Sequence, residues 1–279
     1  LLVNLQDALS KKEIQAYFVD DTTQNTIKEF GWSGEITKTN LDQDYLFVVN
    51  TNIQGQKSDA KIEQSVIHEV AVQSDGTIVD TVVINRSHTG VAGETLYGQT
   101  NIDYLRIYVP QGSQLVRASG FTWPDERMFK VPNTWNEEDS DLLSLEKETD
   151  TDDDSGTRIT QEFGKTAFGN WIITEPGQTT HVQFIYKLPF KAWEENGTSN
   201  LNNWAKIFQS QNPISKYQLI AQKQSGINSA FESQIIYNEG WLPNWKDRNN
   251  VSLASNGMAI KNSHIKSDHM WALMIQRQD

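Results

Sequence analysis

The chain has 279 residues, and its 36 acidic and 24 basic side chains give a formal net charge of -12, which argues against nucleic acid and anionic membrane surfaces as partners. It contains no cysteine, and this excludes disulfides, thiol catalysis and thiolate metal sites. No apolar run approaches the ~20 residues of a membrane-spanning helix.

The first 40 residues predict a small α/β element. Residues 1–12 carry a helical apolar pattern, residues 14–19 predict a strand, and Thr22–Phe30 predicts a helix capped at Asp20-Asp21. Because the chain begins inside a helical pattern, we expect a fragment of a longer protein, with this element as the tail of an upstream domain. So small an element should pack on the following sheet or on upstream residues.

Residues 41–279 predict a mainly β domain with the form of an antiparallel sandwich. Its organising feature is a hairpin of two apolar runs, 62–73 and 77–85, around Asp75-Gly76. An Asp-Gly pair favours a two-residue turn, which would place His68 opposite Val83. Both faces of such a hairpin are largely apolar, so we expect it inside the sandwich.

The histidines suggest metal sites that the predicted pairing disfavours. In the two-residue register His68 and His88 point to opposite faces, and His88 lies across from Glu63, which favours a cross-strand ion pair. His264 and His269 could face each other across a short turn, but with Asp268 they fall short of a complete zinc site.

Further strands follow in chain order, with one acidic interruption at 121–162. That segment lacks periodicity, and we expect a partly mobile excursion from the domain. The remaining predicted strands are 45–49, 104–109, 115–119, 165–173, 180–188, 217–222, 233–237, 257–261 and 270–275.

Several stretches together resemble a known family. They are GWSG at 31–34, NIQGQKSD at 52–59, YLRIYVPQGS at 104–113, GKTAFG at 164–169 and YQLIAQKQ at 217–224. They are similar to an uncharacterised family of bacterial surface proteins, domain of unknown function number 4012. The resemblance implies an exported protein at the cell surface, attached to the membrane only through an N-terminal anchor upstream of this chain. It implies no activity.

The loop after the first long strand is the densest polar cluster. Asn52, Lys57 and Asp59 could contact a polar or anionic ligand, and Lys57-Ser58 invites a Ser–Lys nucleophile. Adjacent residues of an extended chain point to opposite sides, which disfavours that pair. The alternative is that Ser58 and Asp59 bond loop amides where the chain re-enters the sheet.

The acidic segment contains a partial calcium motif. Asp150, Asp152 and Asp154 have the alternate spacing of calcium loops, whose carboxylates suit a hard cation. Ser155 then replaces the required glycine and Gln161 the bidentate glutamate. Calcium is the one possible cofactor, and a solvated acidic loop is the alternative.

Four tryptophans lie in Asn-rich surroundings, namely Trp193, Trp204, Trp241 and Trp245. Exposed rings beside amides suit sugar faces, whereas buried rings would plug the ends of the sandwich. We therefore expect a non-catalytic extracellular module that binds envelope polysaccharide or another surface protein. The alternative is an enzyme acting on envelope polysaccharide, with part of its site on an upstream domain.

Overall fold

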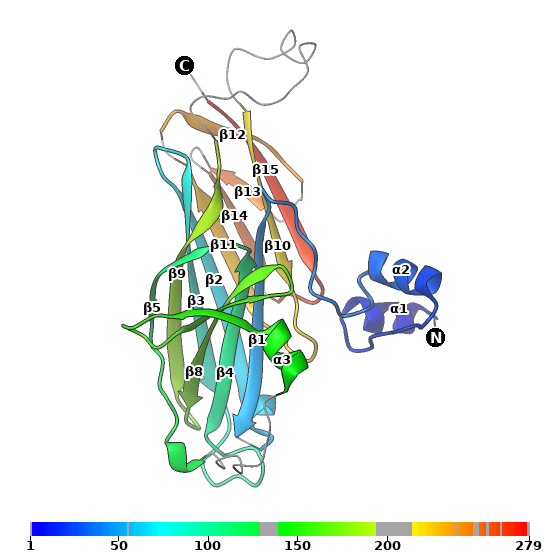
Figure 1. The fold of residues 1–279 in the computed structure, drawn as a ribbon, viewed down its shortest axis with the longest axis vertical. Helices are drawn as coiled ribbons and strands as arrows, with labels where there is room; N and C mark the ends of the chain where they lie inside the picture. The colour runs from blue at the N-terminus through cyan, green and yellow to red at the C-terminus, as the bar shows by residue number, and fades with distance from the viewer. Residues whose placement is uncertain are drawn as a thin grey trace.

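The fold is a sandwich of two β-sheets around one main core (Figure 1), which confirms the predicted mainly β class. The computed structural model describes residues 2–54, 56–128, 139–193, 214–237, 239–247, 251–254, 257–262 and 264–277.

Each sheet takes strands from both ends of the chain. The order of the eight-stranded sheet is β12 (Trp241–Lys246), β15 (His269–Arg277), β10 (Ile214–Gln222), β1 (Asp44–Gln54), β4 (Asn101–Pro110), β8 (Lys165–Thr174), β7 (Arg158–Glu162) and β6 (Lys147–Thr151). The order of the seven-stranded sheet is β13 (Val251–Ala254), β14 (Gly257–Asn262), β11 (Ala230–Ile236), β2 (Ile62–Val72), β3 (Thr77–His88), β9 (Thr179–Lys191) and β5 (Gln114–Ser119).

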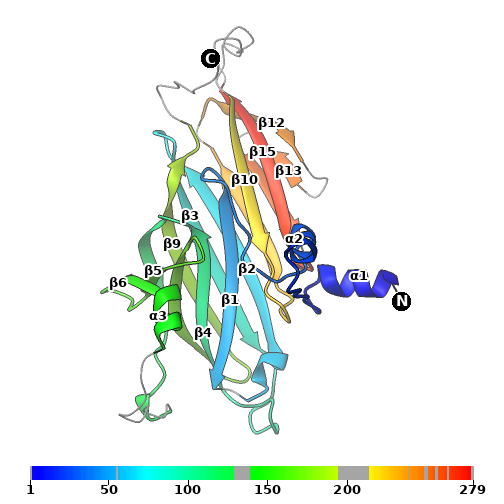
Figure 2. The same ribbon diagram turned by 45° about the vertical axis from the view of Figure 1, so that its right-hand side comes forward.

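The sheets are mixed, so the prediction of a wholly antiparallel body is wrong in two places. β1 pairs with β10 in parallel, and β11 pairs with β2 in parallel. Figure 2 shows β1, β10 and β15 side by side. Parallel neighbours require a crossover connection. Long stretches of chain separate the two strands of each parallel pair, and turn signals, which are local, cannot predict such a pairing.

The predicted hairpin forms, but its register is shifted by one residue. The Gln73 and Thr77 backbones bond across a three-residue loop, in which the Gly76 amide donates to the Gln73 carbonyl. Gly76 has φ +83°, the left-handed conformation typical of the last residue of such loops. His68 therefore lies opposite Val82, and Ile67 opposite Val83.

Side chains alternate along a strand, so a shift of one residue changes which side chains of the two strands lie on the same face of the sheet. His68 and His88 are both buried on the same, inward face, and His88 lies opposite Ile62. The expected ion pair with Glu63 is thus wrong. His88 instead bonds the Gln99 carbonyl through Nε2, at 2.9 Å.

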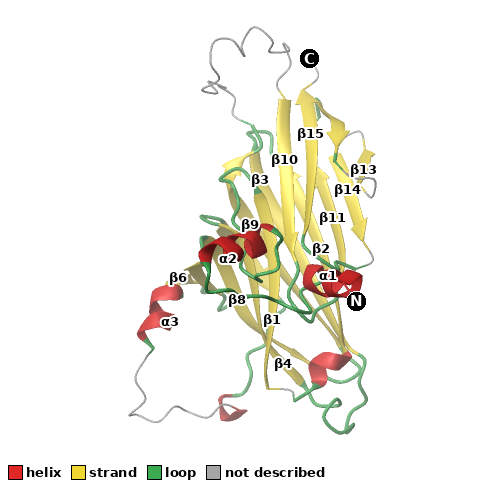
Figure 3. Cartoon of the chain, turned by 90° about the vertical axis from the view of Figure 1, so that its right-hand side faces the viewer, coloured by secondary structure: helices red, strands yellow, loops and turns green. Residues whose placement is uncertain are grey.

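The N-terminal element consists of two helices, α1 (Leu2–Ser10) and α2 (Asp21–Glu29), which project from one side of the sandwich in Figure 1 and face the viewer in Figure 3. Asp20 caps α2 as predicted, since its carboxylate accepts from the Thr23 amide at 2.9 Å. Residues 14–19 form no strand, which corrects that prediction. Among the described residues, no helix is long and apolar enough to cross a membrane.

The acidic excursion is more ordered than predicted. It contains the 3-10 turn η2 (Glu126–Met128), the short helix α3 (Ser140–Leu145), and then β6 and β7, which extend the edge of the first sheet. The short, polar sequences of β6 and β7 lack the apolar alternation from which strands are recognised.

Candidate functional site

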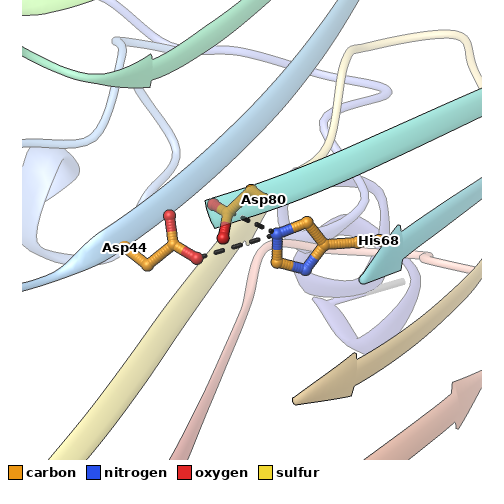
Figure 4. A group of neighbouring side chains, drawn as sticks. All are labelled: Asp44, His68 and Asp80. Carbon is orange, nitrogen blue, oxygen red and sulfur yellow. Dashed lines mark ion pairs between the residues drawn. The ribbon is translucent and has the colours of Figure 1, made fainter. Parts of the chain in front are cut away.

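Three ionisable side chains meet inside the sandwich (Figure 4). Asp44 begins β1, His68 lies within β2 and Asp80 lies on β3, and each is 0% exposed. The Nε2 atom of His68 lies 3.7 Å from Oδ2 of Asp44 and 3.5 Å from Oδ2 of Asp80. Because β1 belongs to one sheet and β2 and β3 to the other, the cluster joins the two sheets.

Hydrogen bonds orient part of this cluster. The Tyr217 hydroxyl donates to the Asp44 carboxylate. Nδ1 of His68 lies 2.9 Å from the Ser233 hydroxyl. Within the described part of the chain, Nε2 of His68 and both carboxylate oxygens of Asp80 have no hydrogen-bond partner.

Burial dominates the protonation of the three groups. It raises the pKa of Asp44 to about 7, and repulsion from Asp80 adds to this shift. Burial also raises the pKa of Asp80 well above its usual value, although the nearby Tyr186 hydroxyl acts in the opposite direction, and burial lowers the pKa of His68. Without a cation, the cluster therefore favours neutral side chains.

A second buried polar cluster surrounds Arg86 on β3. Its guanidinium donates to Gln64 at 3.1 Å and to Asn101 at 3.0 Å, and lies 3.4 Å from the Asp103 carboxylate. It also donates to Asn50. A pocket of about 300 Å³ lies against this cluster.

The predicted ligand loop contributes to the Arg86 cluster through two of its residues. The Asn101 amide donates to the Ser58 hydroxyl at 3.0 Å and to the Asp59 carboxylate at 2.7 Å. Both residues lie in the 3-10 turn η1 (Ser58–Lys61). They satisfy a buried side chain rather than loop amides.

The other two residues of that loop lie elsewhere. Lys57 is exposed, and its backbone amide donates to the Leu96 carbonyl at 3.1 Å. The Asn52 side chain donates to the Gln56 carbonyl at 3.4 Å. Only Asp59 of the four candidates lines the pocket beside Arg86.

An aromatic pocket of about 260 Å³ lies on a different part of the molecule. Its rings are those of Tyr104 on β4, Trp123 in the loop after β5 and Trp171 on β8, and Arg158 of β7 stands beside them. The Tyr104 and Trp171 rings meet edge to face at 5.0 Å, and Trp123 is 60% exposed. Ile53 completes its apolar side.

Two glycines keep this pocket open. A Cβ atom at Gly169 would lie 2.6 Å from the Tyr104 hydroxyl, and one at Gly156 would lie 3.2 Å from Nε1 of Trp123. Any larger residue at Gly169 would force the Tyr104 ring to move. The space between the rings thus depends on these two positions.

Three of the four tryptophans predicted as a sugar shelf lie in the described residues, and they differ in exposure. Trp241 is 5% exposed and its ring stacks on Trp193 at 4.4 Å, with Trp193 packed against the core. Trp245 is 47% exposed on the edge strand β12. Trp204 lies outside the described residues. The stacked pair fits the alternative of rings that plug the sandwich.

The three aspartates of the calcium motif lie around the β6–β7 hairpin. The Asp152 carboxylate accepts from the Ser155 amide at 2.9 Å, and that of Asp150 accepts from the Thr151 amide at 2.8 Å. Among the described residues, the carboxylates that converge closely enough to share an ion with other ligands are instead those of Asp44 and Asp80. Calcium binding at Asp154 and its neighbours stays a prediction.

Comparison with known proteins leaves the chain without an assigned family. No family model matches it, and no curated protein does either. A candidate nutrient binding protein from Legionella pneumophila matches 82% of this chain and 70% of its own, with 9% identity and a TM-score of 0.42. A two-domain M1 zinc metallopeptidase matches 77% of this chain and 42% of its own, with 8% identity and a TM-score of 0.30. The resemblance to family 4012 stays a prediction.

Proposed function

We propose that the chain is a non-catalytic binding module that takes envelope glycan in the pocket of Tyr104, Trp123 and Trp171. The observation that carries this proposal is the convergence of three aromatic rings around an open space beside Arg158. Aromatic faces cover the C–H groups of a sugar, while a guanidinium group donates hydrogen bonds to its hydroxyls.

The cell surface is the proposed location, and it rests on the resemblance to exported bacterial proteins. In that setting an envelope polysaccharide is an abundant ligand, and another surface protein is the alternative partner. The net charge of -12 disfavours nucleic acid and direct contact with an anionic membrane, so membrane attachment would come through an upstream N-terminal anchor.

The alternative of an enzyme has less support. An enzyme of envelope polysaccharide would need an acid or base of shifted pKa at an open pocket. In the part of the chain that the structure describes, the carboxyl groups of raised pKa are those of Asp44, Asp80 and Asp103, which are buried and do not line the aromatic pocket. Glycan binding without catalysis is therefore the better account.

Calorimetric titration with purified bacterial envelope polysaccharide tests the proposal. We expect binding by the wild-type chain and at least about tenfold weaker binding by Trp123→Ala, since truncating a central aromatic contact typically costs over ~1.4 kcal/mol. Trp123 is largely exposed, so the melting temperature should stay within about 2 °C of wild type.

Trp245→Ala is the matched control, because Trp245 is also an exposed ring and lies on the edge strand β12, several strands away from the pocket strands β4, β8 and β7 of the same sheet. It should bind as tightly as wild type. Loss of binding in Trp245→Ala alone would move the site to the β12 edge. Absence of binding to any polysaccharide tested would reject glycan as the ligand.

A further inference from the structure

The spacing of the ligand atoms around His68 differs from that of hydrogen bonds. Its Nε2 atom lies 3.5 Å and 3.7 Å from two carboxylate oxygens, beyond the ~2.7–3.2 Å of a hydrogen bond. Metal–ligand bonds of ~2.0–2.2 Å in a tetrahedron separate the ligand atoms by roughly 3.3–3.6 Å. The two separations from Nε2 lie at or just above this range, and the ligand atoms of Asp44, His68 and Asp80 all lie within 4.8 Å of one another, close enough to face one small cation.

The orphaned atoms point to the same conclusion. Nε2 of His68 and both oxygens of Asp80 lack partners among the described residues, although each side chain is 0% exposed. Buried polar atoms are nearly always satisfied, and buried charges are paired or bind metals. Nε2 of His68 and Oδ2 of Asp80 face each other at 3.5 Å, so an ion between the two side chains would satisfy both.

We propose that Asp44, His68 and Asp80 bind one divalent transition-metal ion, with Zn²⁺ as the best match. Two carboxylates balance its charge, and imidazole with carboxylate suits zinc, whereas calcium takes oxygen ligands alone. These three residues form the one group of converging potential ligands in the described chain.

Neighbouring residues are placed to support the ligands. The Ser233 hydroxyl contacts Nδ1 of His68, which leaves Nε2 free for the ion, and Tyr217 donates to Asp44. Partners of this kind fix the tautomer and the orientation of metal ligands. Ser233 lies on β11 and Tyr217 on β10, so five strands would hold the site.

The proposed site is structural. Its ligands are fully buried, so the ion would bind as the two sheets close on each other, and binding would add to the stability of the sandwich. This role is independent of the aromatic pocket and of the glycan proposal.

Metal analysis of the full chain tests the site. After unfolding in chelator and refolding with Zn²⁺, the wild-type chain should hold about one zinc, and its melting temperature should rise above that of the chain refolded with chelator. Refolding with Co²⁺ should give the visible absorption of tetrahedral cobalt, a readout that requires no substitution.

Asp80→Asn should lose the metal and the dependence of melting temperature on zinc. Asp103→Asn removes another buried carboxylate, in the Arg86 cluster, and should keep both. Metal-free wild-type protein after refolding with zinc, no cobalt spectrum, or a higher melting temperature of Asp80→Asn than of zinc-treated wild type would overturn the proposal.

Discussion

At the residue scale, Arg86 shows how a buried charge is accommodated. The side chain is 2% exposed, and its neighbours offer oxygen atoms on several sides. Asp103 supplies a fully buried counter-charge at 3.4 Å, and Asp59 a half-exposed one at 3.3 Å. The pair with Asp103 connects β3 of one sheet with β4 of the other.

Arg86→Met should destabilise the chain by about 3–5 kcal/mol, because it leaves the buried Asp103 charge and several acceptors without a donor. Urea unfolding measures the change. Asp59→Asn is the control, and it should cost under ~1 kcal/mol because its side chain is 44% exposed. Equal costs for the two variants would show that the buried pair has no special weight.

Lys165 is a second buried cation, with a different environment. It is 2% exposed, donates to the Thr39 hydroxyl at 2.6 Å and lies 4.3 Å from the centre of the Tyr45 ring. Burial lowers the pKa of its ammonium group from 10.5 to about 8. The folded chain thus releases this proton more readily than the unfolded chain does.

This difference predicts a pH dependence. Between pH 8 and pH 10 the unfolded chain keeps the Lys165 proton while the folded chain loses it, so the free energy of unfolding should rise with pH, by at most about 3 kcal/mol. Lys165→Met should lack this increment. Urea unfolding of both proteins across this range gives the difference, in which ionisation of other groups largely cancels. A constant difference would contradict the lowered pKa.

At the element scale, the β2–β3 turn depends on Gly76. Gly76→Ala should destabilise by more than Gly177→Ala, although both glycines have nearly equal positive φ, +83° and +79°. A Cβ atom at Gly76 would lie 2.3 Å from the Trp193 carbonyl oxygen, whereas one at Gly177 would meet no atom within 4 Å.

The control variant should cost ~1–2 kcal/mol for the left-handed backbone alone. The Gly76 variant should cost at least about 1 kcal/mol more, because its backbone must also move. Thermal unfolding of both variants measures this gap. Equal costs would mean that the loop yields to the added methyl group.

The same hairpin shows what could be predicted at this scale. The apolar runs and the Asp75-Gly76 pair located both strands, since these signals are local. They did not fix the loop length. With one more loop residue than predicted, His68 of β2 lies on the same inward face as Asp80 and Arg86 of β3. Asp80 and Arg86 alternate with apolar residues on one face of β3, and this pattern was the sequence signal from which buried polar clusters could have been predicted.

At the scale of the whole molecule, the N-terminal helices should be separable from the sandwich. Deleting residues 1–34 should preserve the β-sheet circular dichroism spectrum and lower stability by roughly 1–3 kcal/mol. The deletion removes an ion pair of 2.7 Å between Lys12 and Asp268, and the bonds of Lys223 and Ser225 to backbone carbonyls. Residues 35–39, which bond Gln222 and Lys165, remain.

Lys12→Met in the full chain is the companion variant, since it removes the ion pair alone. It should account for part of the loss. Non-cooperative unfolding of the shortened chain would instead show that the helices and the sandwich fold as one unit.

Sites were harder to predict than the fold, because they combine residues from distant strands. The aromatic pocket joins Tyr104, Trp123 and Trp171, which are spread over three segments and have no shared motif. The Asn-rich surroundings favoured Trp241 and Trp193 instead, but Trp241 is a core residue and Trp193 is partly buried against the core. Composition around a ring did not indicate whether it was exposed.

The two parallel pairs have a consequence for the time course of folding. β1 and β2 are made well before their partners β10 and β11, which lie beyond residue 213. Neither parallel pair can form until the strands after residue 213 have been made, and contacts so distant in sequence form slowly. A nascent chain that ends before Ile214 should therefore present the unpaired edges of β1 and β2, and such edges promote aggregation.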